Sequence, residues 1–191
     1  MNITSFLLYC FIVTVTPGPT NIDILSTVNN QGTKRAMQYT YGATIAFGLL
    51  LVISALLNTM LITVIPKILI VMQIIGSLYM IYLAYQIYKM DSSKQSASRT
   101  ATFKSGFLMQ FLNPKVVTFT MTVFPSFILP YYTAILPVTI SVITITFIGF
   151  TAFIIWVLFG TIFRKFLQRH QKVVNVIMAL FLLYAAIMIW L

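Results

Sequence analysis

The sequence predicts an all-α membrane protein of six transmembrane helices, arranged as two inverted three-helix repeats in which helices 1 and 4 are broken. Three observations predict it: an apolar composition, six long apolar runs, and the positions of prolines and basic residues. Of the 191 residues, 60% are apolar and 7% are Asp, Glu, Lys or Arg, whereas soluble domains have about 25% charged residues. So few charges cannot cover a water-exposed surface, and we expect most of the surface to face lipid.

The six apolar runs have the length of about 20 residues or more that a membrane-spanning helix requires. They cover residues 4–27, 39–65, 68–88, 105–128, 134–160 and 173–191. The first run has no basic start and no small-residue cleavage site after it, so it does not resemble a signal peptide. We predict one membrane domain over residues 1–191, with a first repeat at about 1–90, a Ser- and Lys-rich cytoplasmic loop at about 89–104 and a second repeat at about 105–191.

Basic residues alternate from loop to loop. Ten of them lie in the loops after the first, third and fifth runs: Lys34, Arg35, Lys89, Lys94, Arg99, Lys104, Arg164, Lys165, Arg169 and Lys172. Only Lys67 lies in a loop on the other side. Because positively charged loops stay in the cytoplasm, both termini are predicted outside. The net charge of +10 does not indicate a nucleic-acid partner, since the basic residues form no continuous polar face.

Two runs are interrupted at corresponding places. Thr16-Pro17-Gly18-Pro19 breaks the first run and Asn113-Pro114 breaks the fourth. With an outward N-terminus and three helices in each half, the halves enter the membrane from opposite sides. Many transporters are built from such inverted repeats, with the substrate site where broken helices meet near the membrane midplane.

The first break has a physical consequence for the backbone. Pro17 and Pro19 lack amide hydrogens, so the carbonyls of Val13 and Val15 lose their helical partners. Freed carbonyls are tolerated at membrane depth only when they are buried in protein or face a wet cavity. A packed kink is one interpretation, but the nearby polar side chains favour a binding site. These are Thr16, Thr20, Asn21 and Asp23, with Gly18 adding backbone freedom.

In the second break, Asn113 is predicted to cap a new helix that begins with Pro114. Lys115 and Thr118 then lie on one face, and Gln110 ends the preceding half. The alternative for Lys115 is snorkelling to the cytoplasmic interface. The predicted substrate-binding residues are Thr16, Pro17, Gly18, Pro19, Thr20, Asn21, Asp23, Gln110, Asn113, Pro114, Lys115 and Thr118.

These motifs resemble the LysE/RhtB family of small amino-acid exporters. The resemblance rests on Thr16 to Pro19 with Asn21, Gly32 and Arg35, on Gly42 to Gly48, on Gly76 to Leu83, on FKSGFLMQFLNPK at 103–115 and on the closing NVIMALFLLYAAIMIW. The last stretch is similar to the branch that exports cysteine and O-acetylserine, although Asp23 stands where that branch usually has an apolar residue. The resemblance implies outward secondary transport across a bacterial plasma membrane, driven by the proton gradient.

Asp23 and Lys115 are predicted to be charges inside the membrane, which usually face a cavity and have partners. A zwitterionic amino acid could offer its ammonium to Asp23 and its carboxylate to Lys115. The two side chains could instead pair with each other in the empty site. Asp23 could also bind and release the proton that couples export to the gradient.

The predicted function is therefore secondary export of amino acids or small derivatives, with a small amino-acid-like substrate and the lipid bilayer as partners. Self-association into a homo-oligomer is compatible with the sequence. The alternatives are a carrier or channel for metal or inorganic ions, and a non-transporting membrane subunit or lipid-modifying enzyme. We expect no enzyme activity, cofactor or resident metal, because Cys10, His170 and two acidic residues provide too few ligands and no phosphate-binding glycine loop is present.

Two further predictions concern packing. Gly42 and Ala46 form a small-xxx-small pair, which usually indicates close helix packing. Trp156 and Trp190 are expected near membrane interfaces, where aromatic side chains are enriched.

Overall fold

A computed structural model describes residues 3–89, 101–188 and 190. Residues 90–100, most of the predicted cytoplasmic loop, lie outside the described residues. Within the described part every regular element is a helix. They are α1 (Ile3–Val15), α2 (Pro19–Gln31), α3 (Thr33–Lys89), α4 (Phe103–Leu112), α5 (Pro114–Val123), the π-helix η1 (Phe124–Ile128), α6 (Ile135–Ile162), α7 (Arg164–Arg169) and α8 (Gln171–Met188).

Both predicted breaks are present. Residues 16–18 separate α1 from α2, and the two helices meet at a bend of 51°. Asn113 separates α4 from α5, with Pro114 as the first residue of α5. Pro125 lies in η1, where the amide of Leu129 bonds to the carbonyl of Phe124 at 2.9 Å. The wider turn of a π-helix thus accompanies this proline.

A loop was expected between the first two apolar runs, but residues 28–38 are nearly all helical. Gly32 alone separates α2 from α3. Its φ of 87° lies in the left-handed region, which glycine adopts without steric cost. Its amide bonds to the carbonyls of Thr27 and Val28 at 3.1 Å each, so one residue is sufficient to end α2 and start α3.

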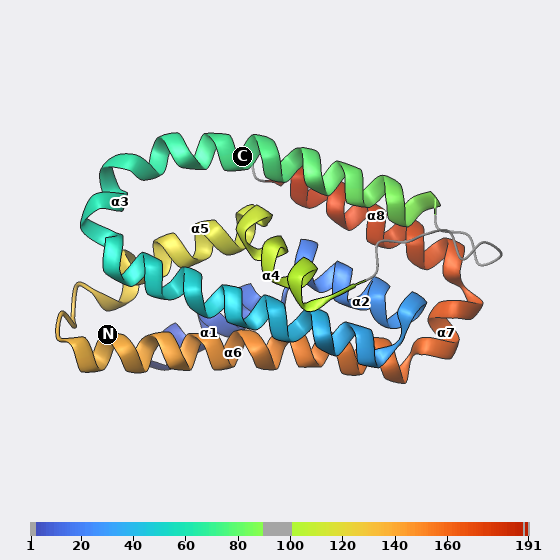
Figure 1. Ribbon diagram of the computed structural model, residues 1–191, viewed down its shortest axis with the longest axis horizontal. Helices are drawn as coiled ribbons and strands as arrows, with labels where there is room; N and C mark the ends of the chain where they lie inside the picture. Colours follow the sequence, from blue (N-terminus) through green and yellow to red (C-terminus); the bar gives the residue numbers. More distant parts are fainter. Residues whose placement is uncertain (1–2, 90–100, 189, 191) are drawn as a thin grey trace.

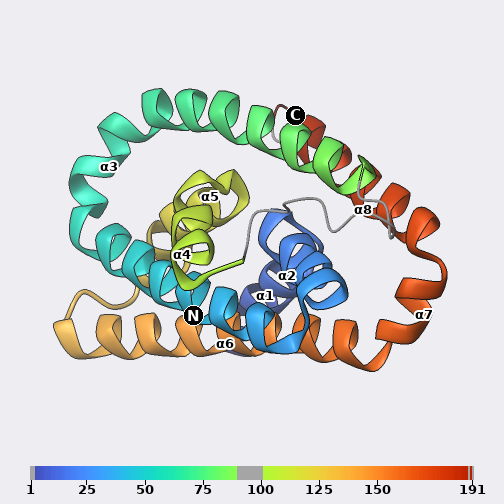
Figure 2. The same ribbon diagram turned by 45° about the vertical axis from the view of Figure 1, so that its right-hand side comes forward.

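The second and third predicted helices form one helix of 57 residues, α3, with no break at the predicted gap around Pro66. Figures 1 and 2 show α3 curving back on itself, so that its two limbs run along different neighbours. The first limb, residues 33–57, packs on α6 through the contact of Phe47 with Gly149. The second limb packs on α8, where Ser77 donates to the carbonyl of Ala186 at 3.4 Å. α4 and α5 lie between the limbs (Figure 2).

Close packing at Gly42 is confirmed. A Cβ on Gly42 would overlap the carbonyl of Phe103 in α4, and a Cβ on Gly106 of α4 would overlap the carbonyl of Tyr39 in α3. Glycines on both helices therefore allow the two backbones to approach each other, as in many membrane helix pairs. This contact sets the position of α4, and hence of the break at Asn113.

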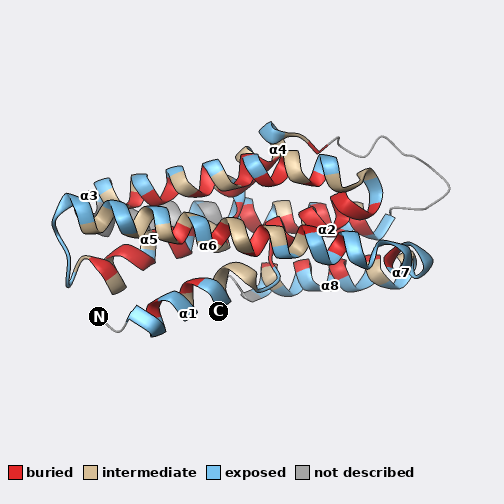
Figure 3. Ribbon diagram, turned by 90° about the horizontal axis from the view of Figure 1, so that it is seen from below, coloured by how far each residue is buried: buried red, intermediate tan, exposed pale blue. Residues whose placement is uncertain are grey.

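The helix α2 is polar yet enclosed. Its buried polar side chains are Thr20, Asn21, Ser26, Thr27 and Asn29. Figure 3 shows buried residues around α2, whereas α6 and α8 present exposed stretches on their outer sides. The outer surface is apolar, with Ile135 87% and Leu56 76% exposed. The arrangement therefore encloses a polar helix within an apolar outer surface, whereas a soluble domain exposes most of its polar residues.

Two helical stretches, Thr33–Leu57 and Ile135–Ile162, are long and apolar enough to cross a bilayer, and the bent pair α1–α2 would be a third if counted as one span. Residues Gln171–Ile187 form a shorter apolar helix. These features define a multi-pass helical membrane protein. The count of six crossings, the inverted repeat and the single-domain division stay predictions.

Candidate substrate site

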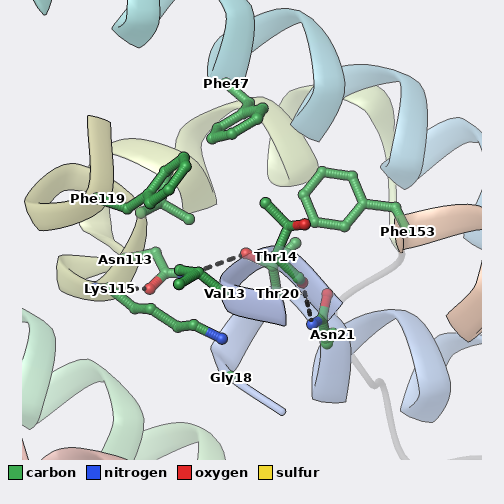
Figure 4. Close-up of a pocket in the computed structure, with 11 residues that line it drawn as sticks. Val13, Thr14, Gly18, Thr20, Asn21, Phe47, Asn113, Lys115, Phe119 and Phe153 are labelled. Carbon is green, nitrogen blue, oxygen red and sulfur yellow. Dashed lines mark hydrogen bonds between the residues drawn. The ribbon is translucent and has the colours of Figure 1, made fainter. Parts of the chain in front are cut away.

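A pocket lies where the two helix breaks meet (Figure 4). Its cavity volume is about 30 Å³, far below the ~300–1,000 Å³ typical of small-molecule sites. Its lining residues come from α1, α2, α3, α5, α6 and the two breaks: Val13, Thr14, Gly18, Thr20, Asn21, Phe47, Asn113, Lys115, Val116, Phe119 and Phe153.

The carbonyls freed by the first break have partners within the protein. Thr16 Oγ1 donates to the carbonyl of Val13 at 2.9 Å. The indole nitrogen of Trp156, on α6, donates to the carbonyl of Val15 at 2.9 Å. We expected Trp156 near an interface; it instead caps this break from the other half of the chain.

Asn21 completes the first break. This residue is 3% exposed, and its Nδ2 donates to the carbonyls of Thr14 at 2.9 Å and Thr16 at 2.8 Å. Gly18 precedes α2 in an extended conformation and makes no side-chain cap. The positive end of the α2 dipole therefore lies at the pocket without a capping side chain.

The second break is capped as predicted. The side-chain oxygen of Asn113 accepts from the amide of Lys115 at 3.1 Å. Its amide nitrogen donates to Thr20 Oγ1 at 2.8 Å, and Gln110 Nε2 donates to the same hydroxyl oxygen at 3.1 Å. Because Thr20 and Gln110 are buried, these bonds join the two breaks inside the protein.

Lys115 reaches from the second break to the first. Its ammonium donates to the carbonyl oxygen of Thr16 at 2.8 Å and to Thr16 Oγ1 at 2.9 Å. The side chain passes over Gly18, where an added Cβ would lie 3.0 Å from Lys115 Cδ and 3.4 Å from its Nζ. The lysine therefore points toward the first break and lines the pocket rather than extending away from it (Figure 4).

Asp23 has different surroundings. It lies on α2, half-buried, and interacts with the hydroxyl of Tyr39, which also has Tyr79 nearby. Asp23 is not among the described residues that line the pocket. Its predicted contact with substrate stays a prediction.

The structure brings most of the predicted site residues together. Gly18, Thr20, Asn21, Asn113 and Lys115 line the pocket. Thr16 and Gln110 bond to lining residues, while Pro19 and Pro114 begin the second helix of each broken pair. Pro17 and Thr118 are exposed, and the lining does not include them.

Sequence reasoning missed the aromatic part of the lining. Phe47 packs with its ring centroid 6.0 Å from that of Phe119 and 6.4 Å from that of Phe153, and all three line the pocket. They come from α3, α5 and α6, so no local spacing connects them among the 16 phenylalanines. The missed residue Thr14 could have been found, because it lies two residues from the proline motif.

A pocket between two broken helices, lined by one cation and several backbone and amide groups, is the arrangement of a secondary transporter. The comparisons with known proteins agree with this class. Residues 11–191 match the family model described as LysE type translocator. The chain belongs to the LysE family of translocators.

Curated relatives match almost end to end. The cysteine/O-acetylserine efflux protein of Escherichia coli (strain K12) is 25% identical over 189 residues, which are 98% of this chain and 97% of that protein. The proteins of the same description from Escherichia coli O139:H28 and Shigella sonnei (strain Ss046) match with the same identity and coverage. No solved structure matches the chain.

Proposed function

We propose that the protein exports amino acids of the size of cysteine and O-acetylserine across the bacterial plasma membrane in exchange for protons. The observation that carries the proposal is the ammonium of Lys115, which crosses between the two breaks and ends in a pocket at Thr16. An amino-acid carboxylate can replace Thr16 as the partner of this cation. The relatives' efflux of cysteine and O-acetylserine supports the size and chemistry of the substrate.

A carboxylate in this pocket would have a second favourable group nearby. The uncapped start of α2 at Gly18 carries the partial positive charge of a helix N-terminus. Half-helix N-termini bind anionic substrate groups in other transporters. The aromatic rings of Phe47, Phe119 and Phe153 would cover a short, apolar or sulfur-containing side chain.

For Asp23 we favour the proton-carrying role among those considered. The carboxylate interacts with the buried Tyr39 hydroxyl rather than lining the pocket. A group in this position could bind a proton without competing with the substrate. The alternative of a metal or inorganic-ion carrier is not favoured, since among the described residues no group of three His, Cys, Asp or Glu side chains could hold a metal.

The inverted repeat has support in the way that the halves interlock. The first broken pair packs on α6 of the second half, and the second broken pair packs on α3 of the first half. The starts of α3 and α7 lie at the same end of the molecule (Figure 1) and carry Lys34, Arg35, Arg164 and Lys165. This end is proposed to face the cytoplasm.

Efflux from proteoliposomes with an imposed proton gradient tests the function. Vesicles are loaded with one amino acid at a time from a panel that includes cysteine and O-acetylserine. We expect gradient-dependent efflux of one or both. Lys115→Gln should abolish it, and Asp23→Asn should retain exchange between internal and external substrate while losing the response to the gradient. Parent-like behaviour of both variants across a pH series would contradict these roles.

Reporter fusions test the orientation. A reporter after Arg99 is expected to read cytoplasmic, and a reporter at the C-terminus is expected to read outside. A cytoplasmic C-terminus would contradict both the six-helix count and the inverted repeat.

A further inference from the structure

Asn21, one of the residues that line the pocket, has a side-chain oxygen without a partner in the described part of the chain. Asn21 lines the pocket and is almost fully buried. Its Oδ1 has no hydrogen-bond donor among the residues that the structure describes. Buried acceptors normally have a donor, so this oxygen is available to a donor that arrives with a ligand.

The chemistry of its neighbours fixes the orientation of this amide. The nitrogen of Asn21 faces the carbonyls of Thr14 and Thr16. Carbonyl oxygens only accept hydrogen bonds, so the amide nitrogen must occupy that side. Rotating the amide by half a turn would bring three oxygens together. The unused oxygen therefore points away from the break carbonyls (Figure 4).

The unused acceptor and the pocket cation are neighbours. The carbonyl oxygen of Thr16 accepts from both Asn21 Nδ2 and Lys115 Nζ, each at 2.8 Å. The amide group of Asn21 and the ammonium of Lys115 thus converge on one atom. An α-amino acid likewise carries its ammonium and its carboxylate side by side on one carbon. Its ammonium can donate to the Asn21 oxygen, and its carboxylate can accept from the Lys115 ammonium.

We propose that the side-chain oxygen of Asn21 binds the ammonium of the exported amino acid while Lys115 binds its carboxylate. This assignment rests on the proposed export of amino acids. It gives the ammonium of the substrate a neutral partner, Asn21, in place of Asp23. A neutral amide oxygen binds through a hydrogen-bond donor, whereas a carboxylate would attract any cation. The pocket therefore selects amines that keep an N–H donor and carry a neighbouring carboxylate.

Binding of three related probes to the purified full-length protein in lipid nanodiscs separates the two roles. The probes are L-cysteine, 3-mercaptopropionate, which lacks the ammonium, and cysteamine, which lacks the carboxylate, all kept reduced. Asn21→Ser should weaken binding of L-cysteine and cysteamine by about tenfold or more, the equivalent of one charge-assisted hydrogen bond. It should leave 3-mercaptopropionate unchanged.

Two matched variants complete the comparison. Lys115→Gln should weaken L-cysteine and 3-mercaptopropionate and leave cysteamine unchanged. Asp23→Asn, two residues away on the same helix, should leave all three probes unchanged. A loss of cysteamine binding in Asp23→Asn with parent-like binding in Asn21→Ser would overturn the assignment.

A measurement on the unmodified protein keeps the test decisive if Asn21→Ser does not fold. The trimethylammonium analogue of cysteine keeps the positive charge but has no N–H group. Its binding should be at least tenfold weaker than that of L-cysteine, and equal binding would overturn the role of Asn21. If the unmodified protein binds none of the probes, the proposed function itself fails, which is a different result.

Discussion

The two helix breaks solve the same backbone problem with partners from different places. At the α4–α5 break, Asn113 caps the helix that it precedes, so the cap comes from the break itself. At the α1–α2 break, one freed carbonyl depends on Trp156, 141 residues away, and another accepts from Lys115, 99 residues away. The cap of the second break is therefore local, whereas the first break is completed only when the other half of the molecule is in place.

This difference has a functional implication. Bonds between halves are the ones that rearrange when two repeats move against each other, as alternating access requires. Bonds within one half can stay intact during such a motion. We therefore expect the contacts of the first break to change when substrate binds. The cap of the second break is expected to stay intact during the motion.

The largest expected effect is that of Gly18→Leu. A leucine would press on the stem of Lys115, because even a Cβ lies 3.0 Å from its Cδ. We expect efflux to be abolished while membrane insertion and expression persist. Gly18→Ala should reduce efflux by a smaller factor.

Gly48→Ala is the matched control for Gly18→Ala. Its Cβ would lie 3.2 Å from the side chain of Thr146, a similarly tight contact between α3 and α6 outside the pocket lining. Parent-like efflux is expected in this variant. Equal losses of efflux in the two alanine variants would mean that tight packing alone, and not the position of the Lys115 side chain over Gly18, accounts for the effect of Gly18→Ala.

A smaller effect is expected for Asn113→Ala. The variant loses a helix cap and one bond to Thr20, which together should destabilise the protein by about 2 kcal/mol. The measurement is thermal unfolding in detergent. Asn113→Asp keeps the acceptor for the amide of Lys115, so it should recover part of the lost stability. No recovery would show that the missing helix cap does not cause the destabilisation.

Trp156→Phe should lower the free energy of unfolding by about 1 kcal/mol, the net value of a single hydrogen bond, which is less than the loss expected for Asn113→Ala. It removes the donor to the Val15 carbonyl and keeps most of the aromatic contact. If the first break depends on the other half, this variant should also change the rate of transport. A parent-like transport rate would remove the distinction between the breaks.

The smallest effect is expected for Thr118→Val. Thr118 was predicted from helical spacing to belong to the site, but its side chain is exposed and outside the pocket lining. Stability should change by no more than about 0.5 kcal/mol, as for most surface substitutions, and efflux should be unchanged. A clear loss of efflux would restore Thr118 to the site.

The sequence predicts the breaks and their nearest polar residues because proline and asparagine act on the backbone within one helical turn. The cap formed by Asn113 and the inward position of Lys115 follow from such local rules. The contacts of Phe47, Trp156 and Tyr39 do not, because they depend on how distant helices cross. The segment over residues 28–38 shows a different limit: it lies between two apolar runs, but nearly all of it continues the helices α2 and α3.

The enclosure of the polar helix α2 constrains how the chain can enter the membrane. A translocon delivers segments to lipid in the order of synthesis, and a segment this polar gains little from partitioning alone. One of its tightest neighbours is α6, where Gly160 packs against Leu25 and Val28, and α6 is synthesised more than a hundred residues later. During biogenesis α2 must therefore wait at the interface, or beside α1 and α3, until the second half of the protein emerges.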